Sequence, residues 1–367
     1  MARRFLMEKR VFFAMKKWLT LALGPAISVA IIYVLIGDDL GAVHDELTQA
    51  RYVYLLPAGG LLVAGLLTRA MRWHVLTDQR LSIWHSFHIL NVGYFLSSLV
   101  PLRLGDVARA YMTTRLEPPV AAFTAISTIV IERLLDLLAL IAMIGLMLLL
   151  LDVPSEVTSA GAVVSMMALL ASLALAALAL KPAWALTVLR WMLQRFPLLE
   201  RFDHQARLQH FIEGVQPMGQ PRIAVGALLW TVVSWAFSLA AGYIILFMLF
   251  DSPTLAATVS LIVLATLSVA LPAVPGNLGP FEGAVVGGLW IGGMVASASP
   301  PENAPAVALG VVLHALTLAI YITLGLVGLV VEHASVRQIT HGAKSFAEES
   351  STEASAQPRS IAQESVS

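Results

Sequence analysis

The sequence predicts an all-α polytopic membrane protein with six to eight transmembrane helices, and its composition is the first reason. Hydrophobic residues make up 58% of the 367 residues and charged residues only 13%. A soluble domain carries about 25% charged residues, so this chain has too little charge to cover a water-facing exterior. The second reason is a series of long apolar runs separated by short polar connections.

Six apolar runs are long enough to cross a bilayer, since a transmembrane helix needs about 20 consecutive apolar residues. We expect these spans at residues 18–37, 53–70, 120–151, 160–181, 222–250 and 305–331. Two further apolar stretches, 83–101 and 255–298, are interrupted by Asn91-Val92-Gly93 and by the run Pro272–Pro280. These two stretches predict broken helices, either re-entrant hairpins or complete spans.

The basic residues predict which loops face the cytoplasm. Residues 1–17, 69–80, 103–117 and 181–222 together hold 18 of the 23 Lys and Arg residues. Basic loops stay on the cytoplasmic side, so we expect both termini there. A complete span at 83–101 would place the arginines of 103–117 outside, and the charge pattern therefore favours a re-entrant hairpin that turns near Gly93.

The chain divides into three regions. Residues 1–17 form a basic cytoplasmic N-terminus, 18–335 form the membrane domain, and 336–367 have the polar composition of a disordered cytoplasmic tail. Within the membrane domain, basic residues of 182–221 are interleaved with Leu and Trp, which predicts amphipathic helices on the inner leaflet. A solvated connector is the alternative for this segment.

A short sequence frame occurs twice. Residues 100–105 read V-P-L-R-L-G and residues 274–279 read V-P-G-N-L-G. Three expected spans separate the copies, and an odd number places them on opposite sides of the membrane. Such a pair is what an inverted repeat produces, the arrangement with which many transporters build a midplane site. A chance match in apolar sequence is the alternative.

Ionisable residues inside a membrane span are functional candidates by default. Glu132, Arg133 and Asp136 interrupt the apolar run 120–151. Glu132 and Asp136 share a helix face, and Arg133 is spaced to pair with Asp136. The group is either an ion pair that stabilises helix packing or a polar patch that meets a lipid headgroup.

A second set of candidates follows the first broken stretch. Arg103, Asp106 and Arg109 lie beside Pro101 and Gly105, which favour an unusual backbone. The planar guanidinium group of arginine binds a phosphate through two hydrogen bonds. These residues therefore predict headgroup binding, with simple topogenic charge as the alternative.

The second broken stretch carries its own candidates. Backbone N–H groups left unpaired at a helix break favour an anion, and this break is shaped by Pro272, Pro275, Gly276 and Gly279. Its polar side chains are Asn277 and Glu282. Glu282 is either a helix-start acid that complements the dipole or a titrating group that meets a headgroup. His314, in the last span, more often packs than binds.

Other function classes find no support in the sequence. The chain has no cysteine and its formal net charge is zero, which excludes thiolate chemistry and gives no electrostatic basis for nucleic-acid binding. It contains no P-loop, G-x-S-x-G or H-E-x-x-H motif. We therefore expect no cofactor, no bound metal and no enzymatic activity.

Three motifs together resemble one family. They read P-L-R-L-G-D-V-A-R at 101–109, E-R-L-L-D at 132–136 and P-x-x-P-G-x-L-G-x-x-E at 272–282. The set is similar to the flippase-like family, which comprises the transmembrane region of lysylphosphatidylglycerol synthase and its stand-alone relatives. Asp106 stands where relatives often have Glu, and Asn277 replaces a commonly small glycine. The positions that match the family motifs are Pro101, Arg103, Gly105, Asp106, Arg109, Glu132, Arg133, Asp136, Pro275, Gly276, Gly279 and Glu282.

The resemblance implies an inner-membrane protein that moves an anionic or glycan-linked envelope lipid between leaflets, or assists in this. A membrane lipid, with its headgroup phosphate, is the expected partner, and a lipid-biosynthesis protein is a further one. No aminoacyl-transferase domain follows the last span, so we do not expect lysine transfer. The alternatives are a small-solute secondary transporter and a non-catalytic scaffold of a lipid-biosynthesis pathway, with an intramembrane enzyme the weakest.

Overall fold

The computed structural model describes residues 28–35, 37, 40–99, 104–151, 216–268, 275–339 and 341–342, with isolated positions between 159 and 170. This part of the chain is helical and contains no strand, which confirms the predicted all-α class. Several expectations concern residues outside it: the basic N-terminus, most of the span at 160–181, nearly all of the connector 182–221 and most of the C-terminal tail.

Four apolar helices are long enough to cross a membrane, and each lies where a span was expected. Two of these helices have a proline in their first turn, Pro221 and Pro305. Proline favours a helix start because the N–H groups of the first turn have no partner within the helix and proline lacks an N–H. The helices are α3 (Leu55–Leu76), α6 (Ala122–Leu150), α10 (Pro221–Leu246) and α13 (Ala304–Val331).

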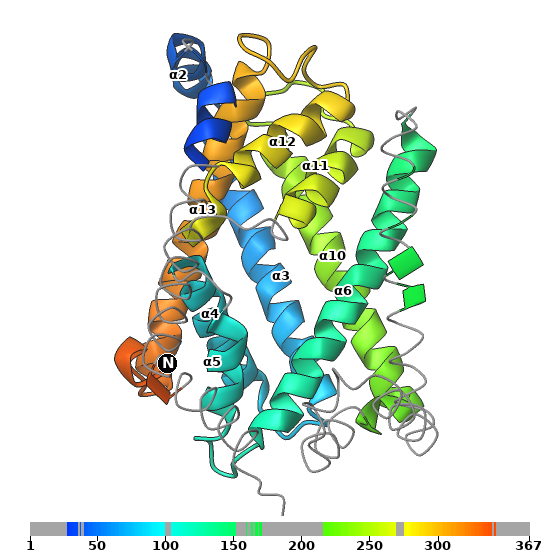
Figure 1. The fold of residues 1–367 in the computed structure, drawn as a ribbon, viewed down its shortest axis with the longest axis vertical. Coiled ribbons are helices and arrows are strands. Elements are labelled where there is room, and N and C mark those ends of the chain that lie inside the picture. The colour runs from blue at the N-terminus through cyan, green and yellow to red at the C-terminus, as the bar shows by residue number, and fades with distance from the viewer. Residues whose placement is uncertain are drawn as a thin grey trace, which may run out of the picture.

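Four shorter helices form two hairpins, which Figure 1 shows entering from opposite ends of the molecule. At 1.5 Å per residue, the helices are about 15 to 25 Å long, less than the ~30 Å hydrocarbon core. The first hairpin consists of α4 (Ile83–Leu99) and α5 (Leu104–Thr113), and the second of α11 (Leu255–Ser268) and α12 (Pro280–Ile291).

The two hairpins approach each other near the middle of the structure. A short 3₁₀ helix, η4 (Pro275–Asn277), lies between α11 and α12. A methyl group added at Gly276 in this segment would lie 3.8 Å from the carbonyl oxygen of Ser98, near the end of α4. The break in each hairpin therefore lies close to the break in the other.

The expected turn near Gly93 is wrong. Residues Asn91 to Gly93 continue α4, in which the Asn91 side-chain amide donates to the Phe87 carbonyl oxygen at 2.8 Å. Gly93 serves close packing instead: a methyl group there would lie 2.7 Å from Cγ of Arg109, and one at Gly105 only 2.0 Å from the Gly93 carbonyl oxygen. Small residues let two membrane helices approach closely, so α4 and α5 pack tightly here.

The order span, hairpin, span occurs twice along the chain: α3, α4–α5, α6, and then α10, α11–α12, α13. Figure 1 shows corresponding helices running in opposite directions. The packing has the same symmetry. The last span of each half packs against the first hairpin helix of the other half, α13 against α4 and α6 against α11, and the two equivalent spans α3 and α10 pack against each other. This is the arrangement that an inverted repeat predicts. The first V-P-x-x-L-G frame ends in the first turn of α5, and the second ends just before α12.

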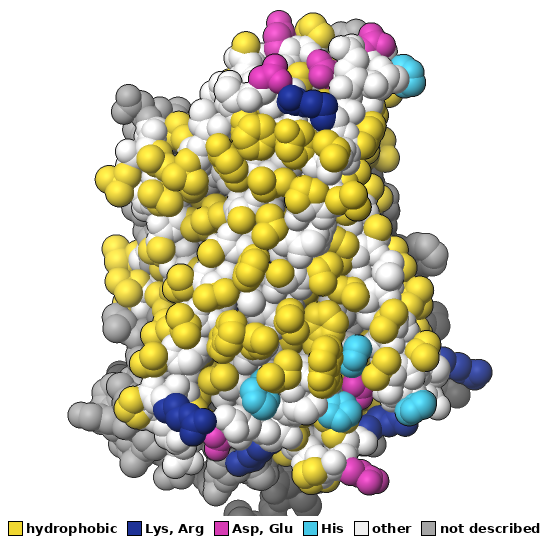
Figure 2. Space-filling model, turned by 180° about the vertical axis from the view of Figure 1, so that it is seen from behind, with side chains coloured by type: hydrophobic (Ala, Val, Ile, Leu, Met, Phe, Trp, Pro, Cys, Tyr) yellow, Lys and Arg dark blue, Asp and Glu magenta, His cyan; other side chains and the backbone are white. Residues whose placement is uncertain are grey.

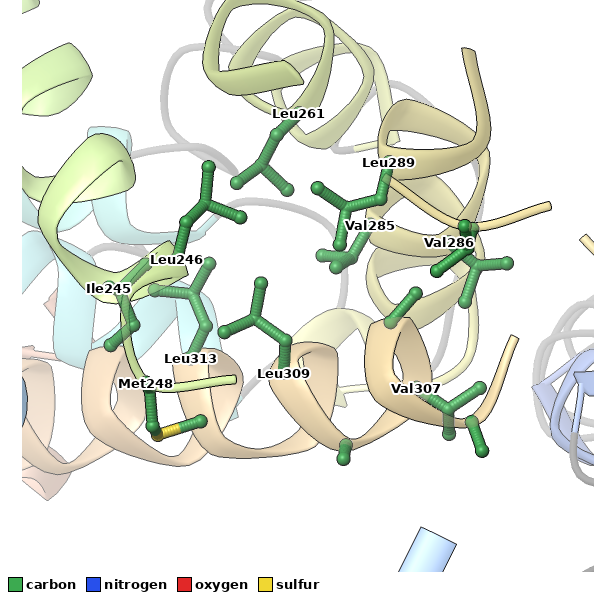
Figure 3. Packing of buried hydrophobic residues seen from close by; sticks show 14 of the residues in the cluster. Ile245, Leu246, Met248, Leu261, Val285, Val286, Leu289, Val307, Leu309 and Leu313 are labelled. Carbon is green, nitrogen blue, oxygen red and sulfur yellow. The ribbon is translucent and has the colours of Figure 1, made fainter. Parts of the chain in front are cut away.

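A buried apolar cluster fixes the second hairpin to the spans beside it. Leu246 of α10, Leu261 of α11, Leu289 of α12 and Leu309 of α13 converge there (Figure 3) and are fully buried. Such interdigitation leaves few voids and resists rearrangement. The hairpin is therefore anchored at its outer part, away from its break.

The outer surface has the distribution of side chains that a membrane requires. Figure 2 shows a broad band of hydrophobic side chains with charged side chains at both ends. One end carries the ion pair Arg51–Asp251 at 2.9 Å, beside α2 (Leu40–Gln49) and the 3₁₀ helix η1 (Tyr52–Tyr54). Arg80, Arg115 and Arg222 are exposed at the other end, where α3 ends and α10 begins.

Candidate functional site

The spans α3 and α6 and the hairpin helix α5 bring charged side chains together inside the apolar band. We call this group the arginine–carboxylate cluster. Arginine guanidinium groups and carboxylates alternate in it, and two of its arginines come from a part of α3 that the sequence analysis had placed in a cytoplasmic loop. Its members are Arg69, Arg72, Asp106, Arg109, Glu132, Arg133 and Asp136.

Arg109 of α5 lies at the centre of the cluster. Its Nη2 donates to Oε2 of Glu132 at 2.8 Å, and both side chains are 3% exposed. The guanidinium also stacks over the ring of Trp73 at 4.1 Å, while the Trp73 indole N–H donates to Thr128 at 3.0 Å. The hydrogen bond and the ring contact place Arg109 in a fixed position, with its charge balanced by Glu132.

Arg72 of α3 binds the other carboxylate of this helix face. Its guanidinium donates to both carboxylate oxygens of Asp136, at 2.7 and 3.2 Å, and to Oγ1 of Thr231 on α10 at 3.2 Å. Its Nε lies 3.9 Å from Glu132. Glu132 and Asp136 therefore share a face as expected, and Arg72 ties that face to α3 and α10.

The pairing expected between Arg133 and Asp136 is not what the structure shows. Arg133 donates instead to both carboxylate oxygens of Asp106 on α5, at 2.9 and 3.1 Å. Arg133 and Asp136 are close enough along the helix to pair, but each is bound by a partner from another helix, Arg133 by Asp106 and Asp136 by Arg72. Asp106 thus links α5 to α6 a second time.

Arg69 is the remaining cation of the cluster. Its Nη1 lies 3.4 Å from the hydroxyl of Tyr94, whose ring stacks on Tyr321 of α13 at 5.0 Å. Beside it is a cavity of about 60 Å³ between α3, α10 and α13. Its lining residues are Leu62, Gly65, Leu66, Arg69, Ser238, Thr317, Ile320 and Tyr321.

Sequence reasoning missed Arg69 and Arg72 because it ended the span at residue 70 and counted both as topogenic. The signal was present, since apolar residues continue to Leu76 and Arg69 keeps helical spacing with Leu66 and Trp73, both buried. Two arginines inside a span would then have counted as functional candidates.

A second polar group lies at the break of the second hairpin. Glu282 of α12 accepts the backbone N–H of Gly279 at 2.6 Å and lies 2.6 Å from Nδ1 of His314 on α13. The other ring nitrogen of His314 lies 2.6 Å from the carbonyl oxygen of Gly276. Because that carbonyl oxygen only accepts, Nε2 carries a hydrogen, and the contact at Nδ1 needs a further proton, on the ring or on Glu282.

The backbone of this break needs its glycines. Gly276 and Gly279 have φ of +79° and +90°, where a side chain is strained. Asn277, at φ +60°, donates from its side-chain amide to the hydroxyl of Ser268 at 3.0 Å. The break is therefore held from two sides: His314 connects it to α13, and Asn277 connects it to the end of α11.

The two polar groups occupy corresponding places in the two halves. Glu132 lies ten residues after the first residue of α6, and His314 ten residues after the first residue of α13. Each pairs with a residue of the preceding hairpin helix, Arg109 or Glu282. In both halves a buried charged or protonated contact fastens a hairpin to the next span.

The predicted residues thus fall into two places. Asp106, Arg109, Glu132, Arg133 and Asp136 meet in the arginine–carboxylate cluster, whereas Asn277 and Glu282 belong to the second break, and no hydrogen bond joins the two groups within the described residues. Gly105 packs on Gly93, and Pro275 begins η4. Pro101, Arg103 and Pro272 lie outside the described residues.

Within the part of the chain that the structure describes, no three His, Cys, Asp or Glu side chains gather as metal ligands would. Searches of curated proteins and of solved structures found no match. A family model does match, over residues 21–346, and it is described as the lysylphosphatidylglycerol synthase TM region. The match covers the spans, both hairpins and both polar groups, and the chain belongs to this family.

Proposed function

We propose that the protein is a lipid translocase, or the membrane part of one, which moves an anionic or glycan-linked envelope lipid between the leaflets of the inner membrane and is not an enzyme. The observation that supports this most directly is the arginine–carboxylate cluster beside a cavity at mid-height of three spans. Polar and charged groups in a membrane interior are costly unless they are paired or face a wet cavity, and they often mark a substrate route or a site.

The two opposed hairpins also support a path that opens to both sides of the membrane. Their breaks lie close together near mid-height, and each hairpin reaches one end of the molecule (Figure 1). In transporters with inverted repeats, such broken helices surround a midplane site that opens alternately to each side. A lipid headgroup would pass along the polar side chains while its acyl chains stay in the bilayer.

The charge distribution supports an orientation. The end that carries Arg80, Arg115 and Arg222 faces the cytoplasm, and the end that carries the Arg51–Asp251 pair faces outside. Both termini then lie in the cytoplasm. A lipid-biosynthesis protein on that side is a further partner.

Reconstitution tests the proposal. The full-length protein is placed in liposomes with trace headgroup-labelled lipids of several classes, and a membrane-impermeant quencher reports exchange between leaflets. We expect faster exchange of an anionic or glycan-linked lipid than in protein-free liposomes or in liposomes with heat-denatured protein. Equal exchange in all three, for every class, would reject translocation by this chain alone and favour a scaffold or a small-solute transporter.

A further inference from the structure

The charges of the arginine–carboxylate cluster do not balance. It holds four guanidinium groups and three carboxylates. Arg72, Arg109 and Arg133 each have a carboxylate oxygen within 2.7 to 2.9 Å. Among the described residues no carboxylate lies within the 4.0 Å ion-pair distance of Arg69. One positive charge therefore remains, and it resides on Arg69.

The groups around Arg69 do not supply the missing negative charge. Its hydrogen-bonding neighbours are the hydroxyls of Tyr94 and Tyr321, which are neutral groups. Asp136 also acts on Arg69 from beyond ion-pair distance, but its carboxylate is bound by Arg72 at 2.7 Å. The two tyrosine rings stack on each other at 5.0 Å with an interplanar angle of 12°. A guanidinium has five N–H donors, so hydroxyl contacts leave donors for a further acceptor.

The cavity beside Arg69 has room for such an acceptor. Its volume of about 60 Å³ is several times the ~10–15 Å³ that a single water requires. Ser238 and Thr317 contribute hydroxyls from α10 and α13, and Leu62 and Ile320 contribute apolar surface. The polar groups thus come from three helices and line one partly open cavity.

The position of the cavity matches that of a transported group. Thr317 lies at the middle of α13, and the next residue, Leu318, approaches Gly276 in the break of the second hairpin. The cavity is therefore at the level where the two hairpin breaks meet, and transporters built from inverted repeats bind their substrates at that level.

We propose that Arg69 is the anion-binding residue of this cavity and that its ligand is a phosphate group. An unbalanced cation in a membrane interior needs an anion, and a planar guanidinium pairs with phosphate oxygens through parallel hydrogen bonds. The phosphate belongs to a lipid headgroup or is free in solution. The lipid source rests on the proposed function, whereas phosphate binding at Arg69 does not.

Direct binding tests this site without any transport. The full-length protein in an uncharged detergent is titrated with tritiated phosphatidylglycerol and with diacylglycerol carrying the same chains. Inorganic phosphate is added as a competitor. The variants are Arg69→Gln, Arg69→Lys and Ser238→Leu, which fills the cavity from its opposite wall. Arg80→Gln is the matched control, because Arg80 is exposed just after the same helix.

We expect Arg69→Gln to weaken phosphatidylglycerol binding about tenfold or more, since a hydrogen bond to a charged group contributes that much. Arg69→Lys should be intermediate, Ser238→Leu as weak as Arg69→Gln, and Arg80→Gln unchanged. Diacylglycerol should bind all forms alike. Competition by millimolar inorganic phosphate would identify free phosphate as the ligand, and its absence a lipid phosphate.

Equal phosphatidylglycerol binding by the unmodified protein, Arg69→Gln and Ser238→Leu would overturn the inference while leaving translocation to its own assay. Phosphatidylglycerol binding that depends on Arg69, combined with no leaflet exchange in liposomes, would uphold the site and reject the translocase. An equal loss for phosphatidylglycerol and diacylglycerol would also overturn it, because the effect would not depend on the phosphate.

Discussion

Glu132 is the residue on which the first polar group depends, since two arginines from different helices approach its two carboxylate oxygens. Arg109 donates at 2.8 Å and Arg72 lies at 3.9 Å. Removing one partner of a buried pair is costly because it leaves the other charge uncompensated. The pair therefore contributes to stability by holding α5 against α6.

Replacing Arg109 by Gln should lower the free energy of unfolding by about 3 to 5 kcal/mol, the range for breaking a buried ion pair. The measurement is the unfolding transition of the detergent-solubilised protein, followed by tryptophan fluorescence. Arg115→Gln, in the exposed turn after α5, is the control and should change the transition little. Equal effects of the two variants would contradict the buried pairing.

The contact between Glu282 and His314 predicts strong coupling between two substitutions. Each single change, Glu282→Gln or His314→Gln, should destabilise the protein by about 1 to 3 kcal/mol, because it leaves a buried polar partner unsatisfied. The double variant should cost less than the sum of the two, as contacting residues do in a double-mutant cycle. Additive costs would show that the 2.6 Å contact contributes nothing.

The sequence predicted which of these residues are functional candidates better than it predicted which side chains they bind. Glu132 and Asp136 share a face because helical spacing fixes it. The partner of Arg133 depends on how α5 packs, and Asp106 on α5 holds it where spacing along α6 had favoured Asp136. Tertiary packing, which one sequence does not contain, decided the choice.

At the scale of elements, the first hairpin depends on two glycines in contact. A methyl group at Gly105 would lie 2.0 Å from the Gly93 carbonyl oxygen. The sequence predicted a break at Gly93 because glycine weakens a helix. Close helix packing is the other use of glycine in membranes, and the sequence pattern did not separate the two uses.

Gly105→Ala should therefore destabilise the protein by about 1 to 3 kcal/mol, the usual cost of overpacking. Gly60→Ala is the matched control within a helix, since a methyl group there meets nothing within 4 Å. It should be neutral or stabilising by up to about 1 kcal/mol. Thermal unfolding of the two variants gives the comparison, and a stabilised Gly105→Ala would refute the close approach of α4 and α5.

Two re-entrant hairpins predict a specific pattern of accessibility, and the chain contains no cysteine that would interfere. Single cysteines at Arg80 and Thr114 flank the first hairpin, and cysteines at Ser252 and Ala296 flank the second; all four positions are exposed. An impermeant maleimide should label 80 and 114 from one side of oriented vesicles and 252 and 296 from the other. The unmodified chain should stay unlabelled.

Labelling of 80 and 114 from opposite sides would mean that the first hairpin crosses the membrane completely. The charge pattern favours the re-entrant hairpin, but labelling the chain ends could not separate the two possibilities, since both place the C-terminus in the cytoplasm. The reversal after Leu99 depends on how α5 packs back along α4, and a hydropathy pattern carries no such information.

At the scale of the whole molecule, the repeated V-P-x-x-L-G frame was the part of the sequence that anticipated the architecture. It marks the end of the break in both hairpins, which enter from opposite ends (Figure 1). The central cavity was not predictable, because Ser238, Thr317 and Arg69 come from three helices far apart in the chain. None of the three stands in a recognisable motif.

Leaflet exchange by a cavity-filling variant tests the central claim most directly. Ser238→Leu places an apolar side chain in the cavity, and Val232→Leu adds one methylene on the exposed face of the same helix. In liposomes with headgroup-labelled anionic lipid, we expect Ser238→Leu to slow exchange at least tenfold and Val232→Leu to match the unmodified protein. Rapid exchange by a folded Ser238→Leu variant would contradict a headgroup path through this cavity.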